Sequence, residues 1–250
     1  MEGKSNPVDS VSGPSQNENT APGLILNNQF DLNVESSYIA SGLTGNASID
    51  EFTVDEFQIL DIVKRDFVAY QMDLAHIEDE ILHRFSGLIG SDIFDQSILV
   101  LDYQTQVWGT VGALDISKIE TCIPFMMGDH FIIIDIKVAG DKYSMILDTG
   151  AEINILDLDT AEQIKKSKMK NIGTTNIQSA SRDHQSTKSV KLQKFQLGKH
   201  SERNQEFSIM SFDFINEGLD YTIDGLIGYP FFEGKKIALD FHTGTLHVYK

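Results

Sequence analysis

The sequence repeats itself at a fixed offset, and this feature constrains the fold more than any other. The tetrapeptide Gly-Leu-Ile-Gly at 87–90 recurs at 225–228, an offset of 225 − 87 = 138 residues. Residues 34–109 placed without gaps on 172–247 share sixteen identities in 76 positions, where chance supplies about five. A period above about 100 residues indicates two copies of one domain, because solenoid repeats are only about 20–50 residues long.

The repeat predicts a domain plan. Residues 1–23 hold three of the five prolines among Ser, Asn, Gln and Gly, which is the composition of a disordered tail. We expect an incomplete or degenerate first lobe at 24–116, because its repeat is recognisable only from about Val34. A complete second lobe is expected at 117–250. Short apolar runs separated by Gly, Asp and Asn at about 8–12-residue intervals predict an all-β fold, with a short helix at most in each lobe.

The second lobe has a readable order of elements. Residues 131–138 and 143–147 form a β-hairpin pattern around the turn 139–142. Asp159 with Glu162 three residues later is a capping box that predicts a helix over 160–168.

A carboxylate follows the second strand of that hairpin directly. Met145-Ile146-Leu147 runs into Asp148-Thr149-Gly150-Ala151. A carboxylate at the end of a buried strand is costly unless it is hydrogen-bonded or used, and Gly150 allows a tight turn and close approach by another chain. Alone, this tetrapeptide also fits an ordinary strand-to-turn corner.

The ordered set of hairpin, Asp-Thr-Gly-Ala, polar segment, Gly-Leu-Ile-Gly and final hairpin resembles the retropepsin-like aspartic peptidases over the whole second lobe. The resemblance implies tandem acid-protease barrels, a peptide or unfolded protein as substrate, and an aspartic endopeptidase without cofactors. It implies catalysis by Asp148, with support from the rest of its loop and from the second Gly-Leu-Ile-Gly. The supporting residues are Thr149, Gly150, Ala151, Gly225, Leu226, Ile227 and Gly228.

Two segments are candidates for flaps that close over substrate. In the second lobe the candidate includes Ala180, Ser181 and Arg182, and in the first lobe it includes Gly42 and Gly45. An ordinary surface loop fits the second-lobe segment equally well.

The chemistry requires two facing carboxylates that share a proton, and the sequence contains one Asp-Thr-Gly. At the 138 offset Asp148 falls on Ser10, beside Asp9, and no glycine follows there. Three readings stay open. Two second lobes form a homodimer, or the first lobe packs on the second as a non-catalytic peptide-binding module, or a segment before Met1 supplies the second Asp. A purely structural barrel is a weaker alternative.

Composition excludes several other classes. Lys and Arg total 20 against 37 Asp and Glu, a net charge of −17, so nucleic acid and anionic membrane surfaces are not expected partners. No apolar run approaches the length of a membrane helix. The single Cys122 and seven scattered His show no metal-ligand spacing. No signal peptide is visible, and the cellular compartment stays undetermined.

Overall fold

The computed structural model describes residues 24–42, 45–75, 78, 83–128, 131–178 and 184–250. These residues form β-strands with a few short helices, so the all-β prediction is confirmed. Within the described part, no helix is long and apolar enough to cross a membrane. We keep the names first lobe and second lobe for residues 24–116 and 117–250.

The second lobe is built on a meander of three antiparallel strands and a set of crossing strands. In space the strands follow the order β12-β13-β16-β11-β17-β10-β9-β8-β19. β10 pairs in parallel with β17, which places two distant segments side by side. The strands are β8 (Ile119–Gly128), β9 (Phe131–Val138), β10 (Asp141–Leu147), β11 (Ile155–Asp157), β12 (Met169–Gln178), β13 (His184–Leu192), β14 (Phe195–Leu197), β15 (His200–Glu202), β16 (Gln205–Met210), β17 (Gly225–Ile227), β18 (Lys236–Asp240) and β19 (Thr245–Tyr249). The helices are α2 (Leu158–Gln163), η3 (Lys166–Lys168), α3 (Asp213–Asn216) and α4 (Tyr229–Phe232).

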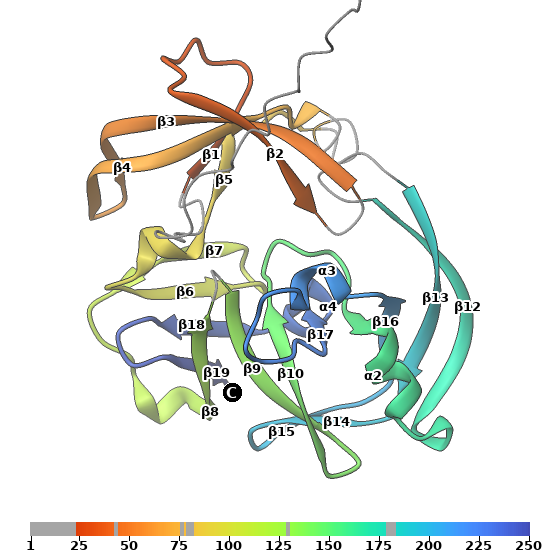
Figure 1. The fold of residues 1–250 in the computed structure, drawn as a ribbon. Coiled ribbons are helices and arrows are strands. Elements are labelled where there is room, and N and C mark those ends of the chain that lie inside the picture. Colours follow the sequence, from red (N-terminus) through yellow and green to blue (C-terminus); the bar gives the residue numbers. More distant parts are fainter. Residues whose placement is uncertain (1–23, 43–44, 76–77, 79–82, 129–130, 179–183) are drawn as a thin grey trace, which may run out of the picture.

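The first lobe has a five-stranded sheet in the order β2-β3-β4-β1-β5, drawn in orange and yellow in Figure 1. This order matches β12-β13-β16-β11-β17 strand for strand, with the parallel pair β1–β4 in the place of β11–β16. The first-lobe elements are β1 (Leu24–Asn27), β2 (Ser36–Gly42), β3 (Gly45–Ile59), β4 (Ile62–Met72), β5 (Gly87–Ile89), η1 (Ser91–Phe94), β6 (Ile98–Asp102), β7 (Val107–Val111) and η2 (Ile116–Lys118).

The element bounds follow the sequence repeat. Adding 138 to the bounds of β5, η1, β6 and β7 gives those of β17, α4, β18 and β19. β1 is different: Leu26 pairs with Gly87 as Leu156 pairs with Gly225, an offset of 130. The first lobe connects β1 to β2 without counterparts of α2 and η3, which accounts for the eight-residue shift. The structural correspondence therefore reaches back to Leu24, further than the sequence indicates.

The two lobes join through strands β6 and β18, which pair antiparallel (Figure 1). Val100 lies opposite Ala238, and these residues are also equivalent in the repeat, since 100 + 138 = 238. Tyr103 N–H donates to the Lys235 carbonyl at 2.9 Å, and the equivalent Phe241 N–H donates to the Ser97 carbonyl at 3.2 Å. The junction is thus symmetric about the Val100–Ala238 pair.

The largest core lies in the second lobe and extends under the junction. It includes the fully buried Phe195, Phe207, Phe231 and Phe232, together with Ile93 and Phe94 of η1. A smaller cluster around Ile146, Ile155 and Leu226 lies at the crossing of β10, β11 and β17.

Most sequence-based expectations for the second lobe hold, with one shift. The hairpin around 139–142 is present as β9 and β10, with Ala139 and Gly140 at positive φ in its turn. The helix expected over 160–168 is wrong in its bounds: α2 begins at Leu158, and its N-cap is Asp157, whose side chain accepts from the N–H groups of Asp159 and Thr160.

We predict that Gly225→Ala destabilises the protein by about 3 kcal/mol or more. Gly225 has a φ of +151°, and a Cβ there would clash with the Ile155 carbonyl oxygen. Gly140→Ala is the matched control, because Gly140 also has a positive φ but faces open space. We expect it to cost about 1–2 kcal/mol. Urea unfolding of both variants measures the difference, and equal losses would contradict the role given to close packing.

Candidate active site

Asp148 stands where the buried strand β10 ends. Met145, Ile146 and Leu147 are buried, and they pair in parallel with Gly225, Leu226 and Ile227. The Asp148 N–H continues this ladder by donating to the Ile227 carbonyl at 3.0 Å. Because β17 fixes the backbone on one side and β9 on the other, the position of the carboxylate is set by the sheet.

The loop after Asp148 holds its carboxylate partly buried. The Gly150 N–H donates to Asp148 Oδ1 at 2.8 Å. Burial raises the pKa of Asp148 above the ordinary value of a carboxyl group, although the N–H groups of Gly150 and Ala151 act in the opposite direction. Thr149 is exposed, and its hydroxyl makes no hydrogen bond within the described part of the chain.

The second Gly-Leu-Ile-Gly crosses next to this loop, as the resemblance implies. Leu226 and Ile227 are buried in two different core clusters. A Cβ on Gly228 would collide with the carbonyl oxygens of Ile153 and Ala151, so only glycine fits there. The Tyr229 N–H donates to the Ala151 carbonyl at 2.7 Å.

Asn154 ties the crossing together, and sequence reasoning missed it. Its side chain is buried, accepts from the Gly228 N–H at 2.9 Å and donates to the Glu206 carbonyl at 3.0 Å. Its placement between Asp148 and an apolar strand was the available signal, because a polar residue there needs partners.

A second polar network, also missed, braces the far side of β10 and β11. Asp224 accepts from the Ser144 N–H at 2.7 Å and from the Thr160 hydroxyl at 2.8 Å. Asp157 accepts from the Phe212 N–H at 2.9 Å as well as capping α2. These carboxylates satisfy backbone donors and serve the framework around Asp148.

An aromatic group from both lobes lies beside Asp148. Tyr103 of the first lobe stacks on Phe232, with ring centroids 5.5 Å apart, and meets Tyr229 edge-on at 5.8 Å. Burial raises the pKa of Tyr103 to about 12, with smaller contributions from Tyr229 and from the negative charge of Asp148. The first lobe therefore reaches the site, although the sequence repeat did not single out Tyr103.

The flap candidates are only partly visible. Ala180, Ser181 and Arg182 lie outside the described residues; the strands β12 and β13 that flank them pair as a hairpin. Gly42 and Gly45 face each other at the end of the β2–β3 hairpin, which is the equivalent hairpin of the first lobe. Their role as flaps stays a prediction.

The first lobe contains a counterpart of the framework. Asn27 takes the place of Asp157: its Oδ1 accepts from the Leu74 N–H at 3.2 Å, and Leu74 is equivalent to Phe212. A Cβ on Gly87 would clash with the Ile25 carbonyl, as one on Gly225 would with Ile155. By the register of β1, the sequence position equivalent to Asp148 is 148 − 130 = 18, so the alignment with Ser10 is wrong. Residue 18 is a glutamate outside the described residues.

Comparison with known proteins bears on this site. The family model described as "Aspartyl protease" matches residues 134–231, the stretch from β9 to α4 that contains Asp148 and its supporting strand. Residues 134–231 are a retropepsin-like aspartic peptidase domain. No curated protein matches the chain. A solved retropepsin-like aspartic protease from Rickettsia conorii is 18% identical, with coverage of 51% of this chain and 88% of that chain and a TM-score of 0.34.

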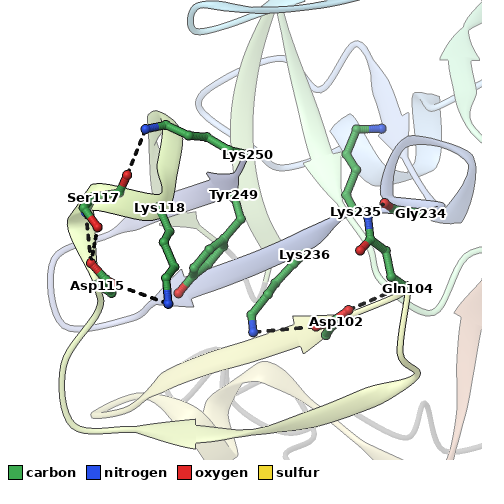
Figure 2. Close-up of a pocket in the computed structure, with 10 residues that line it drawn as sticks. All are labelled: Asp102, Gln104, Asp115, Ser117, Lys118, Gly234, Lys235, Lys236, Tyr249 and Lys250. Atoms are coloured by element: carbon green, nitrogen blue, oxygen red, sulfur yellow. Dashed lines mark hydrogen bonds and ion pairs between the residues drawn. The ribbon is translucent and has the colours of Figure 1, made fainter.

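A cavity of about 620 Å³ lies apart from Asp148, on the strands that join the peptidase domain to the first lobe (Figure 2). Four lysines line it, and the two nearest the carboxylates are paired: Lys118 with Asp115 at 3.3 Å and Lys236 with Asp102 at 3.6 Å. Since those ion pairs neutralise much of the charge, the cavity has little field left for an anion.

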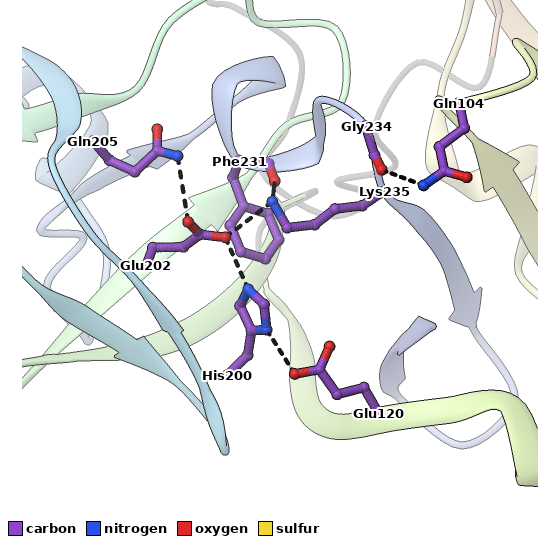
Figure 3. A network of polar contacts seen from close by, with 8 residues as sticks. All are labelled: Gln104, Glu120, His200, Glu202, Gln205, Phe231, Gly234 and Lys235. Atoms are coloured by element: carbon purple, nitrogen blue, oxygen red, sulfur yellow. Dashed lines mark hydrogen bonds and ion pairs between the residues drawn. The ribbon is translucent and has the colours of Figure 1, made fainter. Parts of the chain in front are cut away.

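A polar network fastens the β14–β15 hairpin to the peptidase domain (Figure 3). Glu202 accepts from Lys235 at 2.9 Å and contacts His200 Nε2 at 2.8 Å, while His200 Nδ1 lies 3.2 Å from Glu120. Lysine and histidine hold the pKa of Glu202 below its usual value, despite the opposing effect of burial. Within the described residues, no group of three or more His, Cys, Asp or Glu is arranged to hold a metal ion.

We predict that Asp148→Asn stabilises the peptidase domain at neutral pH. The raised pKa means that the folded protein binds the Asp148 proton more tightly than the unfolded chain. Stability is therefore lost as pH rises from the ordinary carboxyl pKa, about 3.9, through the folded value. The asparagine variant lacks this loss, so its advantage in urea unfolding should be full at pH 7 and vanish near pH 3. An advantage that is constant with pH would contradict the assigned burial.

Proposed function

We propose that this chain is an aspartic endopeptidase in which Asp148 is one of two catalytic carboxylates. The observation that carries the proposal is a partly buried carboxylate of raised pKa, fixed at the end of β10 by β17 and by the Gly150 N–H. The aspartyl protease match over 134–231 supports it. The substrate class is a peptide or an unfolded protein segment.

In this chemistry one carboxylate is ionised and the other keeps a proton, because two like charges about 3 Å apart cannot both ionise. The ionised member activates a water for attack on the peptide carbonyl, and the protonated member donates to the carbonyl oxygen. A raised pKa suits Asp148 to hold the shared proton over part of the acidic range. The hairpins β12–β13 and β2–β3 would close over substrate from the two lobes.

The junction favours an arrangement in which the first lobe faces the second within one chain. β6 occupies the edge of β18, so a second copy of the second lobe cannot pair with that edge unless the lobes separate. The symmetric register about Val100 and Ala238 supports two copies of one domain related by a local two-fold axis. The second carboxylate is then expected opposite Asp148 across that axis.

A peptide-binding module without catalysis is the alternative, and one observation favours it. The sequence position equivalent to Asp148 in the first lobe is Glu18, which is followed by Asn19 and Thr20 and so lacks the glycine of an Asp-Thr-Gly loop. The exposed Thr149 hydroxyl, with no partner within the described residues, agrees with a missing second loop.

The test is cleavage of an unfolded, quenched-fluorescent protein by the full chain between pH 3 and 7. We expect cleavage, and we expect Asp148→Asn to lower its rate about 10³-fold or more, since the general acid–base role is lost. Asp141→Asn, an exposed carboxylate at the start of the same strand, is the control and should cleave normally. A statine-type transition-state mimic should inhibit.

Two further outcomes decide between the readings. Absence of cleavage by a clean monomer that still binds peptide would replace the peptidase by the binding module. Where cleavage occurs, Glu18→Gln reports on the second carboxylate: loss of activity assigns that carboxylate to the same chain, and retention assigns it to another polypeptide.

A further inference from the structure

Two strands of the first lobe end in open edges that are covered in the second lobe. β17 is followed in the sheet by β10, β9 and β8, and β8 then pairs with β19. Their equivalents β5 and β7 are the last strands of their sheets on that side, within the described residues. The three-stranded meander that joins β17 to β19 in the second lobe therefore has no described counterpart between β5 and β7.

Side-chain exposure agrees with an uncovered surface. Leu88 and Ile89 of β5 are 42% and 40% exposed, whereas the equivalent Leu226 and Ile227 are 5% and 0% exposed. On β7, Trp108 is 46% exposed and its equivalent Leu246 is 0% exposed. Apolar side chains on an open strand edge are a template for pairing with another chain.

The residues before β1 are too few to fill the gap. The second lobe uses 36 residues, 119–154, ahead of Ile155, while the first lobe has 24 residues ahead of the equivalent Ile25. The stretches at the sequence positions of β9 and β10 would be 1–8 and 11–17, and each contains a proline. Proline removes a ladder hydrogen bond and is confined to strand edges, starts and bulges.

We propose that the gap between β5 and β7 is a docking site for a β-meander supplied by a separate polypeptide. The second lobe defines the chemistry of that partner. Its last strand runs parallel to β5, as β10 does to β17, and its first strand runs antiparallel to β7, as β8 does to β19. Its middle strand is apolar like β9, which buries Ile132, Ile133, Ile134 and Ile136. Three strands at about 4.8 Å spacing would bridge roughly 19 Å between the two edges.

The probe is a synthetic peptide of residues 119–151 of this chain with Cys122→Ser, added to the intact full-length protein. We expect saturable one-to-one binding, seen by sedimentation, and slower amide exchange at both 86–90 and 107–111. A scrambled peptide of the same composition is the first control. These readouts do not depend on cleavage, so failure here is separate from failure of the proposed activity.

Edge variants sharpen the test. Leu88→Lys and Val107→Lys place a charge on each open edge at exposed positions, so both should fold, which circular dichroism checks. We expect each to weaken peptide binding at least about tenfold. Ile39→Lys is the matched control, because Ile39 is an exposed apolar residue on β2, the opposite edge of the same sheet. It should bind normally.

Three results would overturn the proposal. One is no saturable binding, and another is protection at the β2 edge instead of β5 and β7. The third is strong protection of 86–90 and 107–111 without added peptide, which would assign the gap to residues 1–23 in a monomer or to a second copy in a dimer.

Discussion

The pairing of β6 with β18 is the interaction on which the rest of this structure depends. It joins two segments 138 residues apart into one sheet, and its centre, the Val100–Ala238 pair, is also the point at which the repeat is its own equivalent. The hydrogen bonds from Tyr103 to Lys235 and from Phe241 to Ser97 are related in the same way. A junction of this register places the strand ends of the two lobes on opposite sides of one axis, and that geometry brings Tyr103 of the first lobe beside the charge of Asp148.

Asp148 is costly to the folded state, and the framework around it explains how the cost is carried. Burial opposes its ionisation, while the backbone that presents it is held by buried polar residues that have their own partners. Asn154 fixes the crossing of β17, and Asp224 fixes β10 to α2. Three polar groups therefore stabilise the loop without neutralising Asp148, which leaves its carboxylate available. A framework so complete around a single carboxylate is expected of half of a dyad.

The sequence predicted the all-β class, the β9–β10 hairpin and the place of Asp148 at its end, because strand alternation and a strand followed by Asp-Thr-Gly-Ala are local signals. It also predicted that Leu226 and Ile227 lie next to that loop, by resemblance to a family. The roles of Asn154, Asp224 and Tyr103 were not predicted, since their partners lie 52–130 residues away or more and meet them only in the fold. The eight-residue shift before β2 was missed because a constant offset cannot detect the absence of α2 and η3. The Ser10 alignment failed for that reason, and the pairing of Leu26 with Gly87 corrected it.

The symmetric junction is tested most directly by a disulfide across its centre. In a Cys122→Ser background, Val100→Cys and Ala238→Cys place two thiols on directly opposed residues, within the Cα separation that a disulfide accepts. The account predicts that mild oxidation gives a cross-link within one chain, seen as a monomer of altered mobility on non-reducing gels, with each single variant unchanged. A cross-linked dimer, or no cross-link in the folded protein, would contradict the pairing of the two lobes within one chain.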